Sequence, residues 1–134
     1  MTILVTGGAG YIGSHMVHAL VDQDEPVVVL DNLSTGFRWA IPDKVPLIEG
    51  ETGDAALVAS LIKTHKVDAI IHFAASIVVP ESVAHPLMYY RNNTANSRTL
   101  IEAAVNGGVK HFIFSSTAAV YGNPATVPVA VHGP

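Results

Sequence analysis

The sequence predicts an α/β protein built on a doubly wound parallel sheet, and two observations lead to that prediction. Apolar runs typical of strands alternate with helix-like segments along the 134 residues, as in sheets whose parallel strands are joined by crossover helices. A glycine-rich turn, residues 6–13, follows the first apolar run and opens a helical pattern. We therefore expect one Rossmann-type domain over residues 1–134, with strand order 3-2-1-4-5.

The elements are placed by their apolar patterns. Strands are expected at 2–6, 26–31, 46–49, 68–73 and 110–115. Helices are expected at about 11–23, 54–65 and 87–107, with a short helical turn near 38–41. The last helix should bury one apolar stripe, made of Leu100, Ile101, Ala104 and Val105. Asp54 is expected to cap the second helix, and Gly107-Gly108 to end the third.

The glycines of the first turn have separate roles. Gly7 can adopt the backbone angles of a sharp turn, Gly10 lets the backbone approach a phosphate, and Gly13 lets the helix pack close to the strand. The helix N-terminus offers unpaired N–H groups and a positive dipole end to an anion. The pattern indicates a dinucleotide site, the alternative being a glycine-rich turn in an unrelated α/β protein.

Asp31 strengthens this interpretation. It ends the apolar run 26–30 and lies eighteen residues after Gly13, close to the spacing of about 20 at which dinucleotide folds place an acid. A carboxylate there can accept hydrogen bonds from the adenosine ribose and would repel a 2′-phosphate, which favours NAD over NADP. The alternative is that Asp31 caps a turn or a helix.

Composition excludes several function classes. The chain has no cysteine, hence no disulfide, which suits a reducing cytoplasm. Its net charge is −4, and its seven Lys and Arg residues form no cluster, which argues against nucleic-acid binding. No basic segment precedes an apolar stretch at the N-terminus, so neither a secretory signal nor a membrane role is expected. Residues 111–134 contain no Asp, Glu, Lys or Arg, and we expect other protein to cover them.

The ends of the fourth and fifth expected strands are further candidate ligand sites, because ligands in such sheets bind outside the carboxyl ends of the strands. The small residues of 72–76 would let a flat cofactor approach, although tight packing explains them equally well. Ser115, Ser116 and Thr117 form either an active-site cluster or a hydroxyl-rich turn. His15 and His18 share a helix face but lack a third ligand, so no metal site is expected.

Six motifs occur in a fixed order along nearly the whole chain. They are Thr6-Gly7-x-x-Gly10-x-x-Gly13, Asp31-Asn32-Leu33-Ser34, His72-Phe73-Ala74-Ala75, Glu81-Ser82-Val83, Pro86-Leu87-x-Tyr89-Tyr90-x-Asn92-Asn93 and Phe114-Ser115-Ser116-Thr117-Ala118-x-Val120-Tyr121-Gly122. Together they resemble the extended short-chain dehydrogenase/reductase family, in its branch of NAD-dependent nucleotide-sugar epimerases and dehydratases. The Asp-Asn-Leu-Ser run and the block from Glu81 to Asn93 are much more specific than the glycines.

The resemblance implies an NAD site. The pyrophosphate would lie against Gly7, Gly10, Tyr11, Ile12 and Gly13. The adenosine end would meet Asp31, Asn32 and Leu33, with Ser34, Thr35 and Gly36 near a phosphate and Glu51 and Thr52 near adenine. Further cofactor contacts would come from Phe73, Ala74, Ala75, Ser76, Ile77, Asn92 and Ser115. Thr117 would be the local catalytic residue, hydrogen-bonding the sugar 4-hydroxyl.

Three departures from the family pattern matter. Glu51 stands where an aspartate usually contacts adenine, so that contact is expected to be longer or shifted. Ile77 replaces a lysine that contacts the cofactor in some members. The family's base is the tyrosine of a Tyr-x-x-x-Lys motif, and none of the four tyrosines here has a lysine four residues on. We therefore expect this chain to be the N-terminal part of an enzyme whose base and C-terminal substrate domain lie beyond residue 134, and to be inactive alone.

The activity implied for the parent protein is an isomerase reaction that interconverts UDP-glucose and UDP-galactose through a 4-keto intermediate. The resemblance also implies a UDP-sugar substrate and a homodimer formed through helices that include 87–107. One alternative is another nucleotide-sugar epimerase, dehydratase or decarboxylase; a dehydratase would need an acid beside Thr117, where Ala118 and Ala119 supply none. The other alternative is a non-catalytic NAD-binding module.

Overall fold

The computed structural model describes residues 1–122, which form a five-stranded sheet with helices on both faces. All paired strands run parallel, in the order β3-β2-β1-β4-β5, which confirms the predicted fold class and order. The strands are β1 (Thr2–Thr6), β2 (Val27–Asp31), β3 (Leu47–Glu49), β4 (Val67–His72) and β5 (His111–Phe114). The part of the expected domain from 123 to 134 lies outside the described residues.

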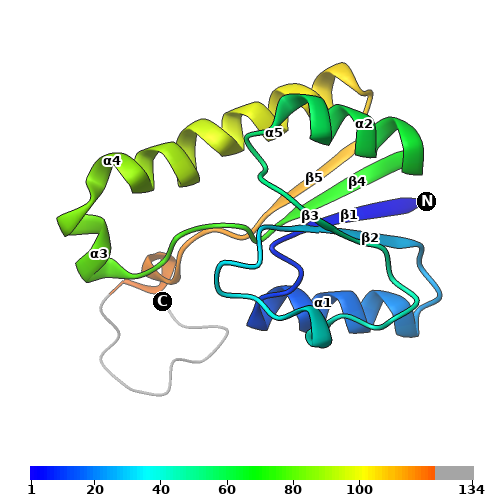
Figure 1. Ribbon diagram of the computed structural model, residues 1–134, viewed down its shortest axis with the longest axis horizontal. Coiled ribbons are helices and arrows are strands. Elements are labelled where there is room, and N and C mark those ends of the chain that lie inside the picture. Colours follow the sequence, from blue (N-terminus) through cyan, green and yellow to red (C-terminus); the bar gives the residue numbers. More distant parts are fainter. Residues whose placement is uncertain (123–134) are drawn as a thin grey trace.

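Three longer helices cover the sheet. Helix α1 (Tyr11–Asp22) lies on one face, and α2 (Ala55–His65) and α5 (Asn96–Asn106) lie together on the other (Figure 1). A 3₁₀ turn, η1 (Arg38–Ala40), occupies the position of the expected helical turn. None of the helices within residues 1–122 is long and apolar enough to cross a membrane.

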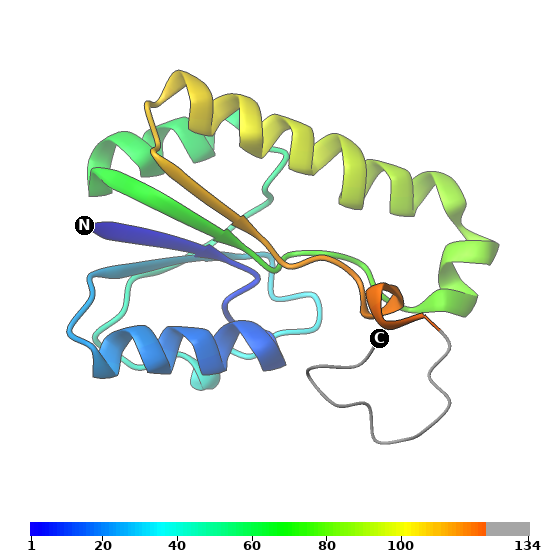
Figure 2. The same ribbon diagram turned by 180° about the vertical axis from the view of Figure 1, so that it is seen from behind.

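The segment between β4 and α5 is more elaborate than expected. The expected helix over 87–107 is present as a continuous helical run, made of α4 (Pro86–Tyr89), a π-helical turn η2 (Tyr90–Ala95) and α5, and a separate short helix, α3 (Val79–Ala84), precedes it. The views from both sides show α3 and α4 beyond the end of the sheet (Figures 1 and 2). Helix α3 was not predicted, because its six residues are too few to show a helical period.

The hydrophobic core has two layers, because alternate residues of a strand point to opposite faces of the sheet. Leu4, Leu30 and Ile70 face α2 and α5, whereas Val5, Val29 and Ile71 face α1. β2 is buried along its whole length, which accounts for its unbroken apolar run.

The helix ends follow the sequence, but the face of α5 does not. Asp54 Oδ1 accepts from Leu57 N at 3.0 Å and caps α2, and α5 ends at Asn106 before the two glycines, both as predicted. The predicted stripe of α5 is half wrong. Leu100 and Ala104 are buried, but Ala103 completes the packed face, while Ile101 and Val105 are 47% and 72% exposed. The packed spacing is i, i+3, i+4, the usual stripe of a helix resting on a sheet.

Candidate functional site

The glycine turn lies between β1 and α1, and two of its glycines are required by the fold. Gly7 has a φ of +69°, and a Cβ there would lie 2.6 Å from Ala74 N. At Gly13 a Cβ would overlap Gly7 O, so only glycine lets α1 begin so close to the strand. The turn is thus packed directly against the chain that follows β4.

Gly10 differs from these two glycines. A Cβ there would meet only Gly7 O, at 3.4 Å, so the protein's own packing leaves room for a side chain. Gly10 is also the N-cap of α1, where it offers no side chain to the first-turn N–H groups, and the first turn contains no acidic residue. No side chain of the first turn therefore compensates the positive end of the helix, and its N–H groups can bind an anion.

Asp31 ties this turn to the loop after β2. The carboxylate is only 8% exposed; its Oδ2 accepts from Ala9 N at 2.9 Å and its Oδ1 from Leu33 N at 2.8 Å. Leu33 has a φ of +56°, and Phe37 N donates to Ala9 O, so the loop folds back onto the glycine turn. Asp31 therefore caps two turns, as the alternative interpretation expected. Each of its carboxylate oxygens still has a lone pair that can accept from a further donor.

Glu51 lies beside Asn32, at the adjoining strand end. Asn32 Nδ2 donates to Glu51 Oε1 at 3.1 Å, and Asn32 Oδ1 accepts from Ser34 N at 3.0 Å. Both side chains are exposed, whereas Thr52 is 5% exposed. The Glu51 carboxylate is therefore hydrogen-bonded to the loop that follows β2.

The chain after β4 is clamped by side chains from the π-helical turn. Asn93 bonds both backbone groups of Ser76: its Oδ1 accepts from Ser76 N and its Nδ2 donates to Ser76 O, each at 2.8 Å. Asn92 Nδ2 donates to Ser76 Oγ, also at 2.8 Å. π-Helical turns occur frequently at functional sites. Ile77, the next residue, is 82% exposed.

His72, the last residue of β4, is the polar residue whose role the sequence analysis missed. It is 2% exposed, and its imidazole bonds Thr6 Oγ1 at 2.6 Å and Ser97 Oγ at 2.9 Å. Burial lowers the pKa of His72 from 6.5 to about 4, so the ring is neutral at physiological pH. A single polar side chain at the end of an apolar strand was the available signal.

The hydroxyl cluster follows β5. Ser115 N donates to His72 O at 3.1 Å, which keeps the two strand ends together. Thr117 Oγ1 accepts from Ala119 N at 3.2 Å and caps the 3₁₀ turn η3 (Ala118–Tyr121). The hydroxyl-rich turn foreseen as an alternative is thus present, with Ser115, Ser116 and Thr117 all exposed.

Comparison with known proteins places this geometry in a family. The model of the NAD dependent epimerase/dehydratase family matches residues 3–132. The chain belongs to that family. A UDP-glucose 4-epimerase of Azospirillum brasilense is 58% identical over 132 residues, which are 98% of this chain and 38% of the relative.

Solved structures agree with this assignment. The crystal structure of a UDP-glucose 4-epimerase from Brucella ovis in complex with NAD is 40% identical with a TM-score of 0.86, covering 98% of this chain and 40% of that one. A UDP-glucose 4-epimerase from Thermotoga maritima, crystallised with UDP-glucose, is 38% identical with a TM-score of 0.87, covering 95% and 41%. The chain therefore spans about 40% of the length of these family members.

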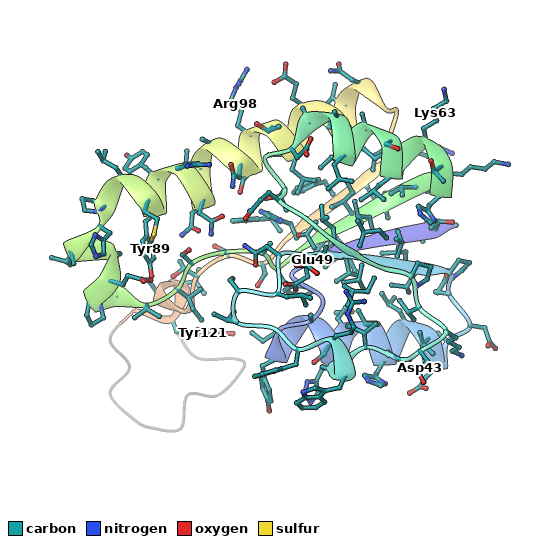
Figure 3. All side chains as sticks on the ribbon, in the orientation of Figure 1. Asp43, Glu49, Lys63, Tyr89, Arg98 and Tyr121 are labelled. Atoms are coloured by element: carbon teal, nitrogen blue, oxygen red, sulfur yellow. The ribbon has the colours of Figure 1, made fainter. Side chains whose placement is uncertain are left out.

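In this member of the family, several of the predicted cofactor residues lie together at the carboxyl ends of the strands. Gly7 meets Ala74, Ala9 meets Asp31 and Gly36, Asn32 meets Glu51, and Ser76 meets Asn92. The side chains drawn in Figure 3 show the labelled Tyr89 and Tyr121 at this end of the molecule and Lys63 and Asp43 at the other. Tyr89 joins α3 to α4, with its hydroxyl 2.7 Å from Glu81 Oε2; partial burial and this hydrogen bond raise its pKa.

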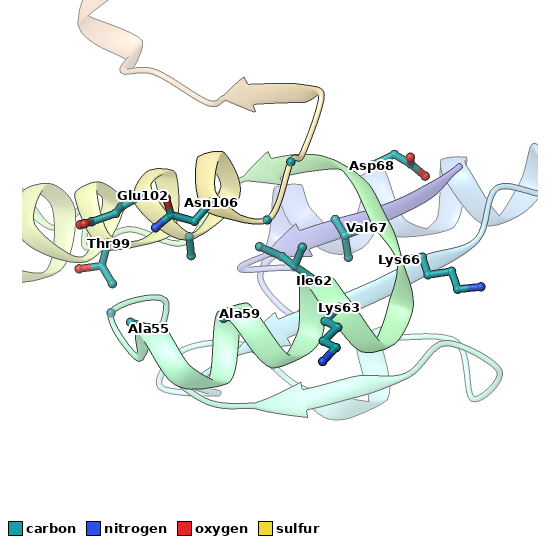
Figure 4. Close-up of a pocket in the computed structure, with 14 residues that line it drawn as sticks. Ala55, Ala59, Ile62, Lys63, Lys66, Val67, Asp68, Thr99, Glu102 and Asn106 are labelled. Atoms are coloured by element: carbon teal, nitrogen blue, oxygen red, sulfur yellow. The ribbon is translucent and has the colours of Figure 1, made fainter.

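Two other features lie away from these strand ends. A groove of about 930 Å³ runs between α2 and α5, along helix residues such as Ala59, Ile62 and Ala103, with Lys63 and Glu102 beside it (Figure 4). His15 and His18 bond the carbonyl oxygens of Tyr11 and Ala40 instead of facing each other across a metal. Residues 1–122 contain no group of three or more side chains arranged to hold a metal ion.

Proposed function

We propose that this chain is the NAD-binding part of a longer UDP-glucose 4-epimerase. The observation that carries the proposal is the pairing of an open, uncapped α1 N-terminus at Gly10 with the buried Asp31 carboxylate that borders the same turn. An anion-binding helix end beside a carboxylate fits the pyrophosphate and ribose of a dinucleotide. The family model and the names of the relatives support the choice of NAD and of a UDP-sugar epimerase.

Residues of this chain would hold NAD in three places. The first-turn N–H groups of α1 would bind the pyrophosphate, and the free lone pairs of Asp31 would accept from ribose hydroxyls. Phe73 to Ile77 would line the other half of the cofactor, held by Asn92 and Asn93. When bound, NAD supplies an acceptor and donor of hydride.

Thr117 would orient the sugar, because its hydroxyl is exposed after β5 and can donate or accept a hydrogen bond. An alcohol without an adjacent base is too weak to take the sugar proton near neutral pH. No Tyr-x-x-x-Lys motif occurs within the 134 residues. We propose that the base and the rest of the sugar site are supplied by residues outside this chain, in an enzyme that acts as a homodimer in the cytoplasm.

Binding of NAD to the purified protein tests the proposal. Isothermal titration calorimetry should show one NAD per chain, and NADP should bind more weakly. Absence of NAD binding by a folded protein would contradict it. Assays of the longer protein with UDP-glucose distinguish the alternatives. Release of UDP-galactose supports an epimerase, whereas loss of water or CO₂ supports a dehydratase or decarboxylase. Absence of turnover supports a non-catalytic module.

A further inference from the structure

We infer that His72 is a positioning residue, which holds the cofactor-lining segment through Ser97 and Asn93 as a neutral imidazole protonated on Nε2. The inference deepens the proposed function and rests on it for the identity of the cofactor. It concerns three side chains whose hydrogen bonds are made within the protein. His72 comes from β4, Ser97 from α5 and Asn93 from the π-helical turn.

The proton positions follow from the donors available. Ser97 Oγ lies 2.8 Å from Asn93 O, and because a carbonyl cannot donate, the single Ser97 hydroxyl proton points there. Ser97 Oγ can then only accept from His72 Nε2, which must carry a proton. Nδ1 of the neutral ring is left as an acceptor, and Thr6 Oγ1 donates to it at 2.6 Å.

This chain of bonds reaches the segment that would line the cofactor. Ser97 fixes the backbone carbonyl of Asn93, and the Asn93 side chain holds both backbone groups of Ser76. His72 and Ser76 are four residues apart in one strand end and loop, so the bonds close a ring from β4 through α5 and back to the chain after β4. The ring fixes the loop at Ser76 relative to the end of β4.

Adjacent Asn92 adds a second hold on the same residue. It donates to Ser76 Oγ, while its own Oδ1 accepts from Asn96 Nδ2 at 3.3 Å. Asn96 in turn packs against Gly53, where a Cβ would overlap its Oδ1. Asn92 and Asn96 therefore join the Ser76 segment to the loop before α2.

A purely structural role for His72 makes different predictions. Every buried side-chain nitrogen and oxygen atom within residues 1–122 has a hydrogen-bond partner, so the network is fully satisfied. If the network only supported folding, breaking it would lower global stability and speed exchange of the β4 amides together with that of Ser76. A positioning network should affect Ser76 and the cofactor and leave the strand amides unchanged.

The first test needs no variant. Nitrogen-15 NMR of the purified, ligand-free protein near neutral pH should show a protonated Nε2 and an unprotonated Nδ1 for His72. Amide hydrogen exchange is then compared among the unmodified protein, Ser97→Ala and Thr99→Ala. Thr99 is a matched control, because its hydroxyl makes the same bond to a carbonyl four residues back, Ala95 O, without touching His72.

Ser97→Ala should speed exchange of the Ser76 amide and weaken NAD binding, each by about two- to tenfold, while amides of β1 and β4 keep their rates. Thr99→Ala should change neither quantity, and Ser97→Thr, which keeps the hydroxyl, should restore both. A proton on Nδ1, or equal Ser76 exchange in Ser97→Ala and Thr99→Ala, would overturn the inference. If the unmodified protein binds no NAD, the proposed function fails, and the NMR and exchange results still decide the role of His72.

Discussion

At the scale of single residues, Asp31 has a structural role and a proposed role in cofactor selection, and a substitution by alanine would remove both at once. Its carboxylate holds Ala9 N and Leu33 N, and it would also select the cofactor. Asp31→Ala would remove both functions and leave the buried Ala9 N–H without an acceptor, at a cost of about 1–3 kcal/mol, and the half-buried Leu33 N–H as well, at a smaller cost. Asp31→Asn removes the charge while keeping one carbonyl acceptor, so only one of the two N–H groups loses its partner.

We expect Asp31→Asn to narrow the preference for NAD over NADP by about 1–2 kcal/mol, because a neutral amide no longer repels a 2′-phosphate. Calorimetric titrations with both cofactors measure the difference. Asp43→Asn, an exposed carboxylate near the opposite end of the molecule, should leave the preference unchanged. Equal affinities for the two cofactors in the unmodified protein would show that Asp31 does not face the ribose.

His72 makes stability depend on pH. Its pKa is about 4 in the fold and 6.5 in the unfolded chain, so between these values the unfolded chain binds more protons. The free energy of unfolding should therefore fall as the pH falls from 6.5 to 4, by on the order of 3 kcal/mol from this residue. Urea unfolding of the unmodified protein and His72→Gln across this range measures the difference. The same pH dependence of the free energy of unfolding in both proteins would show that the pKa of His72 is not lowered by folding.

At the scale of elements, the glycine turn divides its residues between fold and ligand. Gly13 is required because α1 passes over Gly7 O, whereas Gly10 has space for a side chain on the protein side. The sequence pattern alone does not distinguish them, since both glycines belong to the same motif. Substituting each glycine by alanine therefore tests the role in folding and the role in ligand binding separately.

Gly13→Ala should destabilise the protein by about 1–3 kcal/mol, because the overlap with Gly7 O outweighs the gain of about 1 kcal/mol in helix propensity. Gly10→Ala should lower the free energy of unfolding by less than about 1 kcal/mol, because alanine is a poor N-cap. It should weaken NAD binding by at least as large a free energy. Urea unfolding and calorimetry measure the two effects. Equal effects of both variants on stability would show that Gly10 is also confined by the fold.

At the scale of the whole molecule, large apolar side chains are exposed around the proposed site. Ile113 and Phe114 of β5 are 57% and 59% exposed, and Val79, Val83 and Leu87 of the α3–α4 segment are each more than 70% exposed. Exposed apolar surface of this kind usually marks contact with other protein. That other protein covers residues 111–134 stays a prediction, and Ile113 and Phe114 support it for β5.

The chain of 134 residues alone should not interconvert UDP-glucose and UDP-galactose, because it lacks the Tyr-x-x-x-Lys pair and general-base catalysis contributes about 10²–10⁴-fold. A longer protein that includes this motif should be active. In that protein, Thr117→Ala should lower turnover more than it weakens NAD binding, and Ser60→Ala, on an exposed face of α2, should do neither. Epimerisation by the purified chain, free of host enzyme, would overturn the expectation.

Much of the fold was determined by the sequence itself, because it depends on local patterns. The apolar run ending at Asp31 predicted a buried parallel strand, the glycine turn predicted the start of α1, and Asp54 predicted the start of α2; all three are observed. Backbone geometry links these signals to neighbours within a few residues, so no knowledge of the rest of the chain was needed.

Only the tertiary structure decided what depends on residues far apart in the chain. The sheet beneath α5 selected Ala103 over Ile101 as a buried residue, although both fit a helical stripe. The bonds from His72 to Thr6 and Ser97 span 66 and 25 residues, and those from Ser76 to Asn93 span 17. A polar side chain has no preferred distant partner in the sequence, because its hydrogen bond is satisfied by whichever donor or acceptor packing brings within about 3 Å.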